Sequence, residues 1–186
     1  MMRETEVIRR KEKIFEGHYL RLERFHVLLP DGTHGHREVV GVKNAVAVLP
    51  VDDAGVVRLV RQYRPAIDRQ ILEIPAGIID GEETEAEAAR RECEEETGYR
   101  PRHLKKLITY ASAVGYSTGF ITLFLGTGLE YTGNIHLDPT EFLESFSLTF
   151  DRLMDKVFRN EIIDSKTIVC MLLARDALSG VAADSA

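Results

Sequence analysis

The pattern of apolar and polar residues predicts an extended, strand-rich segment over residues 1–42. Within it, residues 19–29 alternate in part between apolar and polar side chains, which is the period of a half-buried strand. Turn-forming residues follow at 30–33, and the chain then returns through residues 37–40. The apolar face of this segment is too small to be stable alone, so we expect it to pair with another surface.

Longer apolar runs follow and predict the strands of a core. Two of them, residues 44–51 and 56–63, are joined by a tight turn. A short extended piece at residues 72–75 ends at a proline, and further strands are predicted at residues 104–110 and 120–125. The chain is long enough for these strands to form the sheet of one well-cored domain.

Helical signals lie between and after these strands. Thr84 and Glu87 fit a capping box, and Gly98 fits the position after a helix end, so a helix is predicted between them. A second helical region is predicted from Thr149, and a third helix over residues 164–178. Strands, a helix, further strands and then helices predict an α/β sandwich with a mixed sheet.

The first of these helices carries acidic residues on one face. Glu92, Glu95 and Glu96 are spaced i, i+3 and i+4, so their carboxylates lie on the same side of the helix. Like charges about 6 Å apart repel by roughly 3 kcal/mol per pair at an effective dielectric near 20. A hard cation such as Mg²⁺, bound through carboxylate oxygens, removes this repulsion. The alternative is a solvated acidic face, but the helix contains no Lys to relieve the charge and follows a glycine loop.

Composition narrows the classes of partner. The chain has 186 residues, of which 44% are hydrophobic and 29% are charged, as in a soluble globular protein. Its net charge of −6 argues against nucleic acid, because phosphate backbones are bound by clustered Lys and Arg. The charged N-terminus lacks the apolar stretch of a signal peptide, and no apolar run reaches the length of a membrane span. We therefore expect a cytoplasmic protein with no membrane partner.

Cysteine and histidine spacing suggests no further metal site. The two cysteines, Cys93 and Cys170, are far apart, which fits neither a disulfide framework nor a zinc site. His34 and His36 have the spacing of metal ligands, but they follow a hairpin turn signal. We interpret them as part of a polar loop.

The segment from Gly77 to Tyr99 resembles the Nudix box, with the same residue types at the same gaps. Cys93 is the one departure, since the family usually has a larger aliphatic residue there, and a buried cysteine is a packing variation. The matching residues are Gly77, Glu83, Arg91, Glu92, Glu95, Glu96, Gly98 and Tyr99.

The resemblance implies a Nudix-type α-β-α sandwich with a mixed sheet, plus an N-terminal antiparallel β segment. It also implies hydrolysis of a nucleoside diphosphate linked to another group, with Mg²⁺ as cofactor and Mn²⁺ as an alternative. The implied metal ligands are the carbonyl of Ala76 and the carboxylates of Glu92, Glu95 and Glu96, with Glu95 binding metal or orienting water. The implied catalytic residues are Glu95, Glu96, Glu92 and Arg91, and the implied substrate-binding residues are Arg64, Arg37, Glu73 and Gly77.

Segments outside the box resemble the branch of ADP-ribose pyrophosphatases and nucleoside diphosphate sugar hydrolases. They are QYRP at residues 62–65, LEIPAGIIDGE at residues 72–82 and IDSKT at residues 163–167. The N-terminal segment resembles the dimerising β-segment of this branch, which implies a homodimer in which Arg37 contacts the substrate of a partner subunit. We expect three parts, namely a dimerising β segment at 1–42, a Nudix hydrolase domain at 43–178 and a flexible tail at 179–186.

The loop that contains Gly119 departs from the pattern of this branch, so the sequence does not decide which residue activates water. Gly119 stands where the branch often has a glutamate that positions or deprotonates water, and glycine has no side chain to accept a proton. Glu95, Glu141 or Glu144 then takes over this role, or catalysis differs. The alternatives to hydrolysis of ADP-ribose or a related nucleotide sugar are hydrolysis of dinucleotides, flavin adenine dinucleotide or coenzyme A, and a sensor that binds nucleotide sugars without turnover.

Overall fold

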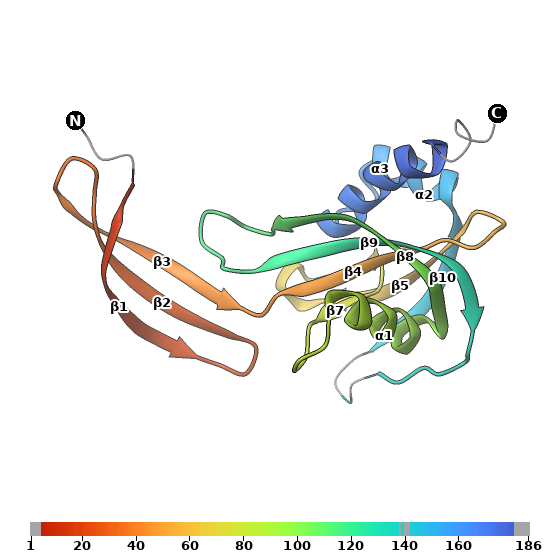
Figure 1. Ribbon diagram of the computed structural model, residues 1–186, viewed down its shortest axis with the longest axis horizontal. Coiled ribbons are helices and arrows are strands. Elements are labelled where there is room, and N and C mark those ends of the chain that lie inside the picture. Colours follow the sequence, from red (N-terminus) through yellow and green to blue (C-terminus); the bar gives the residue numbers. More distant parts are fainter. Residues whose placement is uncertain (1–4, 138, 140–141, 181–186) are drawn as a thin grey trace. The chain divides into compact units, whose positions relative to one another are not determined.

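The computed structural model describes residues 5–137, 139 and 142–180 (Figure 1). Within it the chain forms two compact units. The first, which we call the N-terminal unit, contains Met1–Asn44 and Tyr110–Phe120. The second, the core unit, contains Ala45–Thr109 and Ile121–Ala186.

The N-terminal unit is built on a three-stranded antiparallel sheet. Its strands are β1 (Val7–Glu16), β2 (Leu20–Leu28) and β3 (His34–Val42), in that order. This confirms the predicted N-terminal antiparallel segment. The polar loop predicted at His34 and His36 was wrong, because both residues lie in β3, where His36 pairs with His26 of β2. The polar turn residues at 30–33, just before these histidines, had suggested a loop.

The central sheet of the core unit is mixed, as predicted. Its order is β7 (Ala76–Ile78), β4 (Ala45–Pro50), β9 (Phe120–Tyr131) and β8 (Tyr99–Ala111). β4 runs parallel to β9 and antiparallel to β7. The middle of β4 and of β9 is buried as a continuous run, which is the pattern of strands covered on both faces.

A second antiparallel sheet of the core unit contains strands that the sequence pattern described less well. Its order is β10 (Leu143–Thr149), β5 (Val56–Arg64) and β6 (Arg69–Glu73). β10 was not predicted, since its side chains are half-buried or exposed and show no apolar run. The tight turn between β4 and β5 is present, with Gly55 at a φ of 72°. The strands that it joins belong to different sheets and pair with each other only through an antiparallel bridge between Val51 and Val57, next to the turn.

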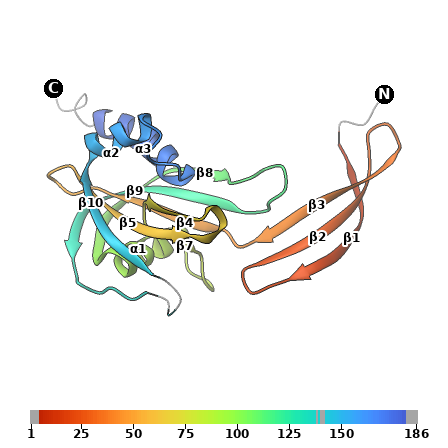
Figure 2. The same cartoon turned by 180° about the vertical axis from the view of Figure 1, so that it is seen from behind.

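Helices cover both faces of the central sheet. α1 (Glu85–Thr97) lies on one face and α3 (Ser165–Gly180) on the other, against β4, while α2 (Phe150–Phe158) packs against β5 and β10 of the second sheet (Figures 1 and 2). Small side chains of α1 let it approach the sheet closely, and the resulting core confirms the α-β-α sandwich. This core contains Val46, Val48, Ala88, Ala89, Cys93 and Phe124.

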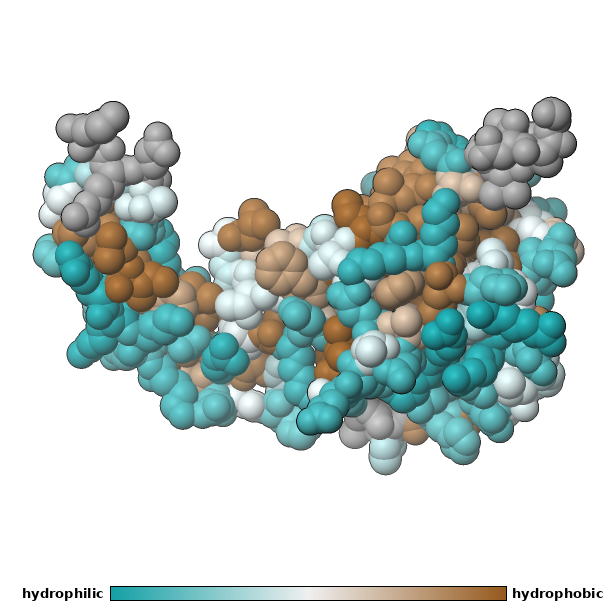
Figure 3. Space-filling view, in the orientation of Figure 1, coloured by the Kyte–Doolittle hydropathy of each residue, from teal (hydrophilic) through white to brown (hydrophobic). Residues whose placement is uncertain are grey.

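The outer surface of α2 and α3 carries apolar side chains. Figure 3 shows them gathered over these helices, where Phe158, Leu172 and Leu173 are exposed. Among the described residues, no helix combines the length and apolar character needed to cross a membrane.

Candidate active site

Local sequence signals set both ends of α1. The Thr84 hydroxyl accepts a hydrogen bond from the Glu87 amide at 3.2 Å, and the Glu87 carboxylate accepts one from the Thr84 amide at 2.8 Å. At the other end, Gly98 adopts a φ of 75° and its amide donates to the Glu94 carbonyl. The predicted capping box and C-terminal glycine are both confirmed. The acidic residues of the helix therefore project from a segment with fixed ends.

Arg91 holds the carboxylates of this helix together. Its Nη1 atom donates to Glu92 at 2.6 Å and to Glu95 at 3.1 Å. Its Nε and Nη2 atoms donate to the two carboxylate oxygens of Glu83 at 3.1 and 2.7 Å, and Nη2 also donates to the Ile78 carbonyl. These bonds, led by those to Glu83 and opposed by burial, raise the pKa of Arg91 above its ordinary value. Arg91 thus ties the helix to the residues before it.

The strand β7 and α1 approach each other where Gly77 has no side chain. A Cβ atom at Gly77 would lie 2.0 Å from Oε1 of Glu92, so no larger residue fits while this carboxylate keeps its place. Beside it, the Ala76 amide donates to Oε2 of Glu96 at 3.1 Å, and Glu96 is only 5% exposed. Two of the predicted metal-binding carboxylates therefore meet at the Ala76–Gly77 backbone.

The donor atoms at this place suit a hard divalent cation. Glu92 and Glu96 offer carboxylate oxygens, and the predicted third donor is the Ala76 carbonyl, all of which are ligand types of Mg²⁺. Glu95 is more exposed than Glu92, at 34% against 13% of its side chain. Within residues 5–137, 139 and 142–180, no group of three acidic, His or Cys side chains converges as a ready metal cage. Arg91 instead occupies Glu92 and Glu95 with hydrogen bonds.

Arg64 and Glu73, both predicted to bind substrate, form a pair. Arg64 donates to both oxygens of Glu73, at 2.6 and 2.8 Å. Hydrogen bonding to Glu73 raises the pKa of Arg64 despite its partial burial, and the charges of Asp164 and Glu96 add to the effect. The charge of Glu96 on α1 therefore reaches Arg64, whereas Glu73, 1% exposed, is buried.

The structure brings most predicted site residues into one part of the core unit. Arg37 belongs instead to the N-terminal unit, where it pairs with Glu6 and donates to the His36 carbonyl at 3.0 Å. The residues brought together in the core unit are Arg64, Glu73, Ala76, Gly77, Arg91, Glu92, Glu95 and Glu96.

The candidates for activating water differ in their surroundings. Glu95 is held by Arg91, and Glu144 lies on β10 with Arg61 at 3.4 Å. Glu141 lies outside the described residues. Gly119 closes a loop of the N-terminal unit, in which its carbonyl accepts from the Ser112 amide at 3.1 Å. Of these groups, Glu95 lies among the other carboxylates of α1.

Sequence reasoning named the residues that support this site but did not predict their contacts. Glu83 precedes the cap of α1, so helical spacing did not connect it with Arg91. Lys166 was noted only as part of a motif, and Asp164 also as the N-cap of the third helix, yet they hydrogen-bond with each other at 3.0 Å, and Lys166 also bonds with Glu73. The IDSKT string was the available signal for both.

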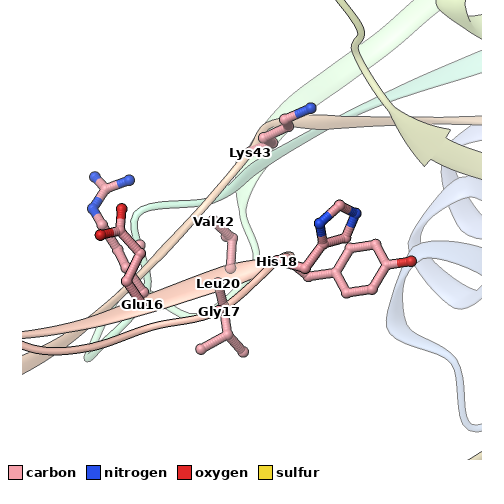
Figure 4. A pocket seen from close by; sticks show the side chains of 9 residues that line it. Glu16, Gly17, His18, Leu20, Val42 and Lys43 are labelled. Carbon is pink, nitrogen blue, oxygen red and sulfur yellow. The ribbon is translucent and has the colours of Figure 1, made fainter.

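A separate hollow of about 220 Å³ lies at the turn between β1 and β2 in the N-terminal unit. Figure 4 shows His18 and Lys43 among its lining side chains. His18 and Tyr19 contact each other edge to face, with ring centroids 4.7 Å apart. Glu16 is the only carboxylate among the lining residues, so this hollow does not resemble the acidic site of the core unit.

The fold is an α-β-α sandwich, and at its site a strand that contains Gly77 faces a capped acidic helix. A family model described as NUDIX domain matches residues 41–168. The chain therefore belongs to the Nudix hydrolase family, whose members generally use divalent metal ions.

Curated relatives match along most of the chain. It is 37% identical over 158 residues to an ADP-ribose pyrophosphatase of Bacillus subtilis, covering 84% of this chain and 85% of that protein. It is 35% identical over 161 residues to a methanol dehydrogenase activator of Bacillus methanolicus, covering 86% and 87%. A crystal structure of an ADP compounds hydrolase superposes with a TM-score of 0.86, at 22% identity over 95% of this chain and 96% of that one, which shows the shared fold.

Proposed function

We propose that this protein is a Mg²⁺-dependent pyrophosphohydrolase of ADP-ribose or a related nucleoside diphosphate sugar. The observation that carries the proposal is the meeting of Glu92 and Glu96 at the Ala76–Gly77 backbone, with Arg64 alongside. Two relatives, the ADP-ribose pyrophosphatase of Bacillus subtilis and the ADP-sugar pyrophosphatase of mouse, support the substrate class.

In the proposed reaction, water attacks one phosphorus of the diphosphate and the bridging P–O bond breaks. The products are a nucleoside monophosphate and a sugar phosphate. Glu92, Glu96 and the Ala76 carbonyl would hold the metal ion, which supplies charge neutralisation for the diphosphate and acidifies water. Arg64 binds the diphosphate, and Arg91 keeps the carboxylates of α1 in place. Glu95 accepts the proton of the attacking water.

The test is turnover of ADP-ribose by the wild type and by Glu96→Gln, with products resolved by anion-exchange chromatography. A glutamine oxygen can still accept the Ala76 amide hydrogen bond, so the fold should survive while turnover is lost. Glu161→Gln, on an exposed ion pair with Lys156, is the matched control and should retain wild-type turnover. Chelation should abolish activity and Mg²⁺ should restore it. Undiminished turnover by Glu96→Gln would refute the assigned site.

The methanol dehydrogenase activator among the relatives favours a substrate panel wider than nucleotide sugars. Dinucleotides, flavin adenine dinucleotide and coenzyme A belong in that panel, since each contains a diphosphate. If one of them is hydrolysed faster than ADP-ribose, the substrate assignment changes and the site assignment stands.

A sensor without turnover is the second candidate, and Gly119 is the observation that favours it. Binding of ADP-ribose with Mg²⁺ but without product would establish the sensor. Restoring a glutamate by Gly119→Glu meets an obstacle, because a Cβ atom there would lie 2.5 Å from Cγ2 of Val42. The gain of rate should therefore be tested in Gly119→Glu combined with Val42→Ala.

We also propose a cytoplasmic homodimer joined through residues 1–42, with residues 43–178 as the hydrolase domain and 179–186 as a tail. Residues 181–186 of that tail lie outside the described residues. Light scattering at micromolar concentration tests the dimer, and a monomer would refute it. Support for the dimer comes from exposed apolar side chains of the N-terminal unit, namely Ile8, Ile14, Phe15, Tyr19 and Leu20.

Two buried free thiols, Cys93 and Cys170, support a reducing compartment, which cell fractionation can test.

A further inference from the structure

A buried ionic cluster joins the end of β6 to the start of α3. At its centre, the Glu73 carboxylate accepts hydrogen bonds from Arg64 at 2.6 and 2.8 Å and from Nζ of Lys166. Burial alone would raise the pKa of Glu73, but the hydrogen bonds and charges of Arg64 and Lys166 outweigh burial and lower it. Glu73 is therefore an ionised group with two cations sharing its charge.

The two cations differ in what they offer to a ligand. The Lys166 side chain is 12% exposed, whereas that of Arg64 is 43% exposed. Arg64 bonds to Glu73 through Nε and Nη2, and among the described residues its Nη1 atom has no hydrogen-bond partner. The charge of Glu96 also acts on Arg64, so the guanidinium is within electrostatic reach of the acidic residues of α1. Arg64 is thus placed to bind an anion, and Lys166 is enclosed.

Lys166 is itself fixed by the first turn of α3. Oδ1 of Asp164 accepts from Lys166 at 3.0 Å, while Oδ2 accepts from the amide and the hydroxyl of Thr167 at 3.0 and 2.5 Å. The Thr167 hydroxyl oxygen accepts from the Ile74 amide at 3.0 Å, and Thr167 is fully buried. The strand leaving Glu73 and the helix carrying Lys166 are therefore joined by backbone and side-chain hydrogen bonds.

We propose that Lys166 is a positioning residue that keeps Arg64 oriented toward the diphosphate of the substrate and only partly neutralised by Glu73. This inference rests on the proposed function. Lys166 shares the charge of Glu73, so Glu73 does not neutralise Arg64 fully. It also holds the Glu73 carboxylate in the plane that receives both donors of the guanidinium fork. Without Lys166, the carboxylates of Glu73 and Asp164 face a single guanidinium, and this net negative group attracts a diphosphate less strongly.

The experiment measures KM and kcat for ADP-ribose in Lys166→Met and Lys166→Arg. We expect Lys166→Met to raise KM by about tenfold or more and to lower kcat by less than about threefold, since ground-state binding is lost. Lys166→Arg retains the charge and should stay within about threefold of the wild-type KM. Lys156→Met removes a lysine from an exposed ion pair on α2 and should leave KM unchanged. A wild-type KM in a folded Lys166→Met protein would overturn the inference.

A second comparison covers the case in which Lys166→Met does not fold, because this variant leaves Glu73 with one cation fewer. Glu73→Gln removes the buried charge, so Glu73→Gln with Lys166→Met should fold. In the Glu73→Gln background the Lys166→Met change should alter KM by less than about twofold, because Lys166 then keeps only its bond to Asp164 and no longer acts on Arg64 through the Glu73 charge. An effect there of tenfold or more would overturn the inference, because Lys166 would then act independently of Glu73.

Failure of the proposed function can be separated from failure of this inference. If the wild type hydrolyses no ADP-ribose, the enzyme assignment fails, and binding of methylenediphosphonate with Mg²⁺ then decides the role of Lys166. Calorimetry should show binding weakened about tenfold in Lys166→Met and restored in Lys166→Arg. Equal affinities in wild type and Lys166→Met, or no binding by the wild type, would overturn the inference.

Discussion

Replacing Gly77 by alanine is the sharpest perturbation of the site that the structure offers. The added Cβ atom would lie 2.0 Å from Oε1, 2.1 Å from Cδ and 2.4 Å from Oε2 of Glu92. Non-bonded heavy atoms are most stable at about 3.5 to 4.0 Å, so the carboxylate must retreat by about 1.5 Å. All three terminal atoms of the side chain are involved, so a rotation of the carboxylate about its own axis cannot relieve the contact.

This displacement of Glu92 should lower the activity of Gly77→Ala far more than its stability. Glu92 is bonded to Nη1 of Arg91 at 2.6 Å, and a shift of 1.5 Å breaks that geometry together with the proposed metal site. Misplacing a group at a reacting centre by about 1 Å can cost about a hundredfold in rate, so we expect kcat of Gly77→Ala to fall by about that factor. The Glu92 side chain can move without unfolding α1, and overpacking of this kind costs about 1–3 kcal/mol of unfolding free energy.

Steady-state hydrolysis of ADP-ribose with Mg²⁺, alongside thermal unfolding, tests this reasoning. Gly35→Ala is the matched control, because a Cβ atom at Gly35 would meet Leu29 at an ordinary 3.4 Å. Glu92→Asp shortens the side chain by one methylene, so Gly77→Ala should cost less in that background than in the wild type. A Gly77→Ala protein with kcat within threefold of the wild type would show that the position of Glu92 does not limit the reaction.

Three further predictions concern the surroundings of the site. Arg91→Lys replaces a planar fork with a point charge and should lower kcat by about 10- to 100-fold without unfolding the protein; wild-type kcat would show that the clamp is dispensable. Thr84→Ala removes the cap of α1 and should cost about 1 kcal/mol, seen as a fall of about 2–4 °C in Tm, and an unchanged Tm would contradict it. Burial raises the pKa of Cys93 and of Cys170 to about 12, so at about pH 8 iodoacetamide should label neither thiol before unfolding; labelling of the native protein would contradict this burial.

The relation between sequence and structure differs from element to element. The acidic helix was predictable at both ends, because a capping box and a C-terminal glycine act on residues within one turn. The mixed sheet followed from the order of apolar runs. β10 was hidden because its apolar residues are few and half-buried, and its place is set by pairing with β5 far away in the chain.

Within the site, the sequence by itself determined which groups are present and which of them share a helix face. Glu92, Glu95 and Glu96 follow from helical spacing alone, since a period of 3.6 residues leaves no other arrangement. Only the tertiary structure decided what those groups contact. Glu92 meets Gly77 because β7 pairs with β4 under α1.

The residues that hold Arg64 in place also depend on the tertiary structure, because they are far apart in the sequence. Glu73 and Lys166 are separated by 93 positions, and no periodic pattern connects residues so far apart. They meet because Thr167 binds the backbone after β6 and brings the start of α3 against it. The spacing of residues on one helix depends only on neighbouring positions, so the sequence alone identified the acidic helix. The contacts between Glu73, Lys166 and Arg64 form only once strands and helices have packed, so only the tertiary structure showed them.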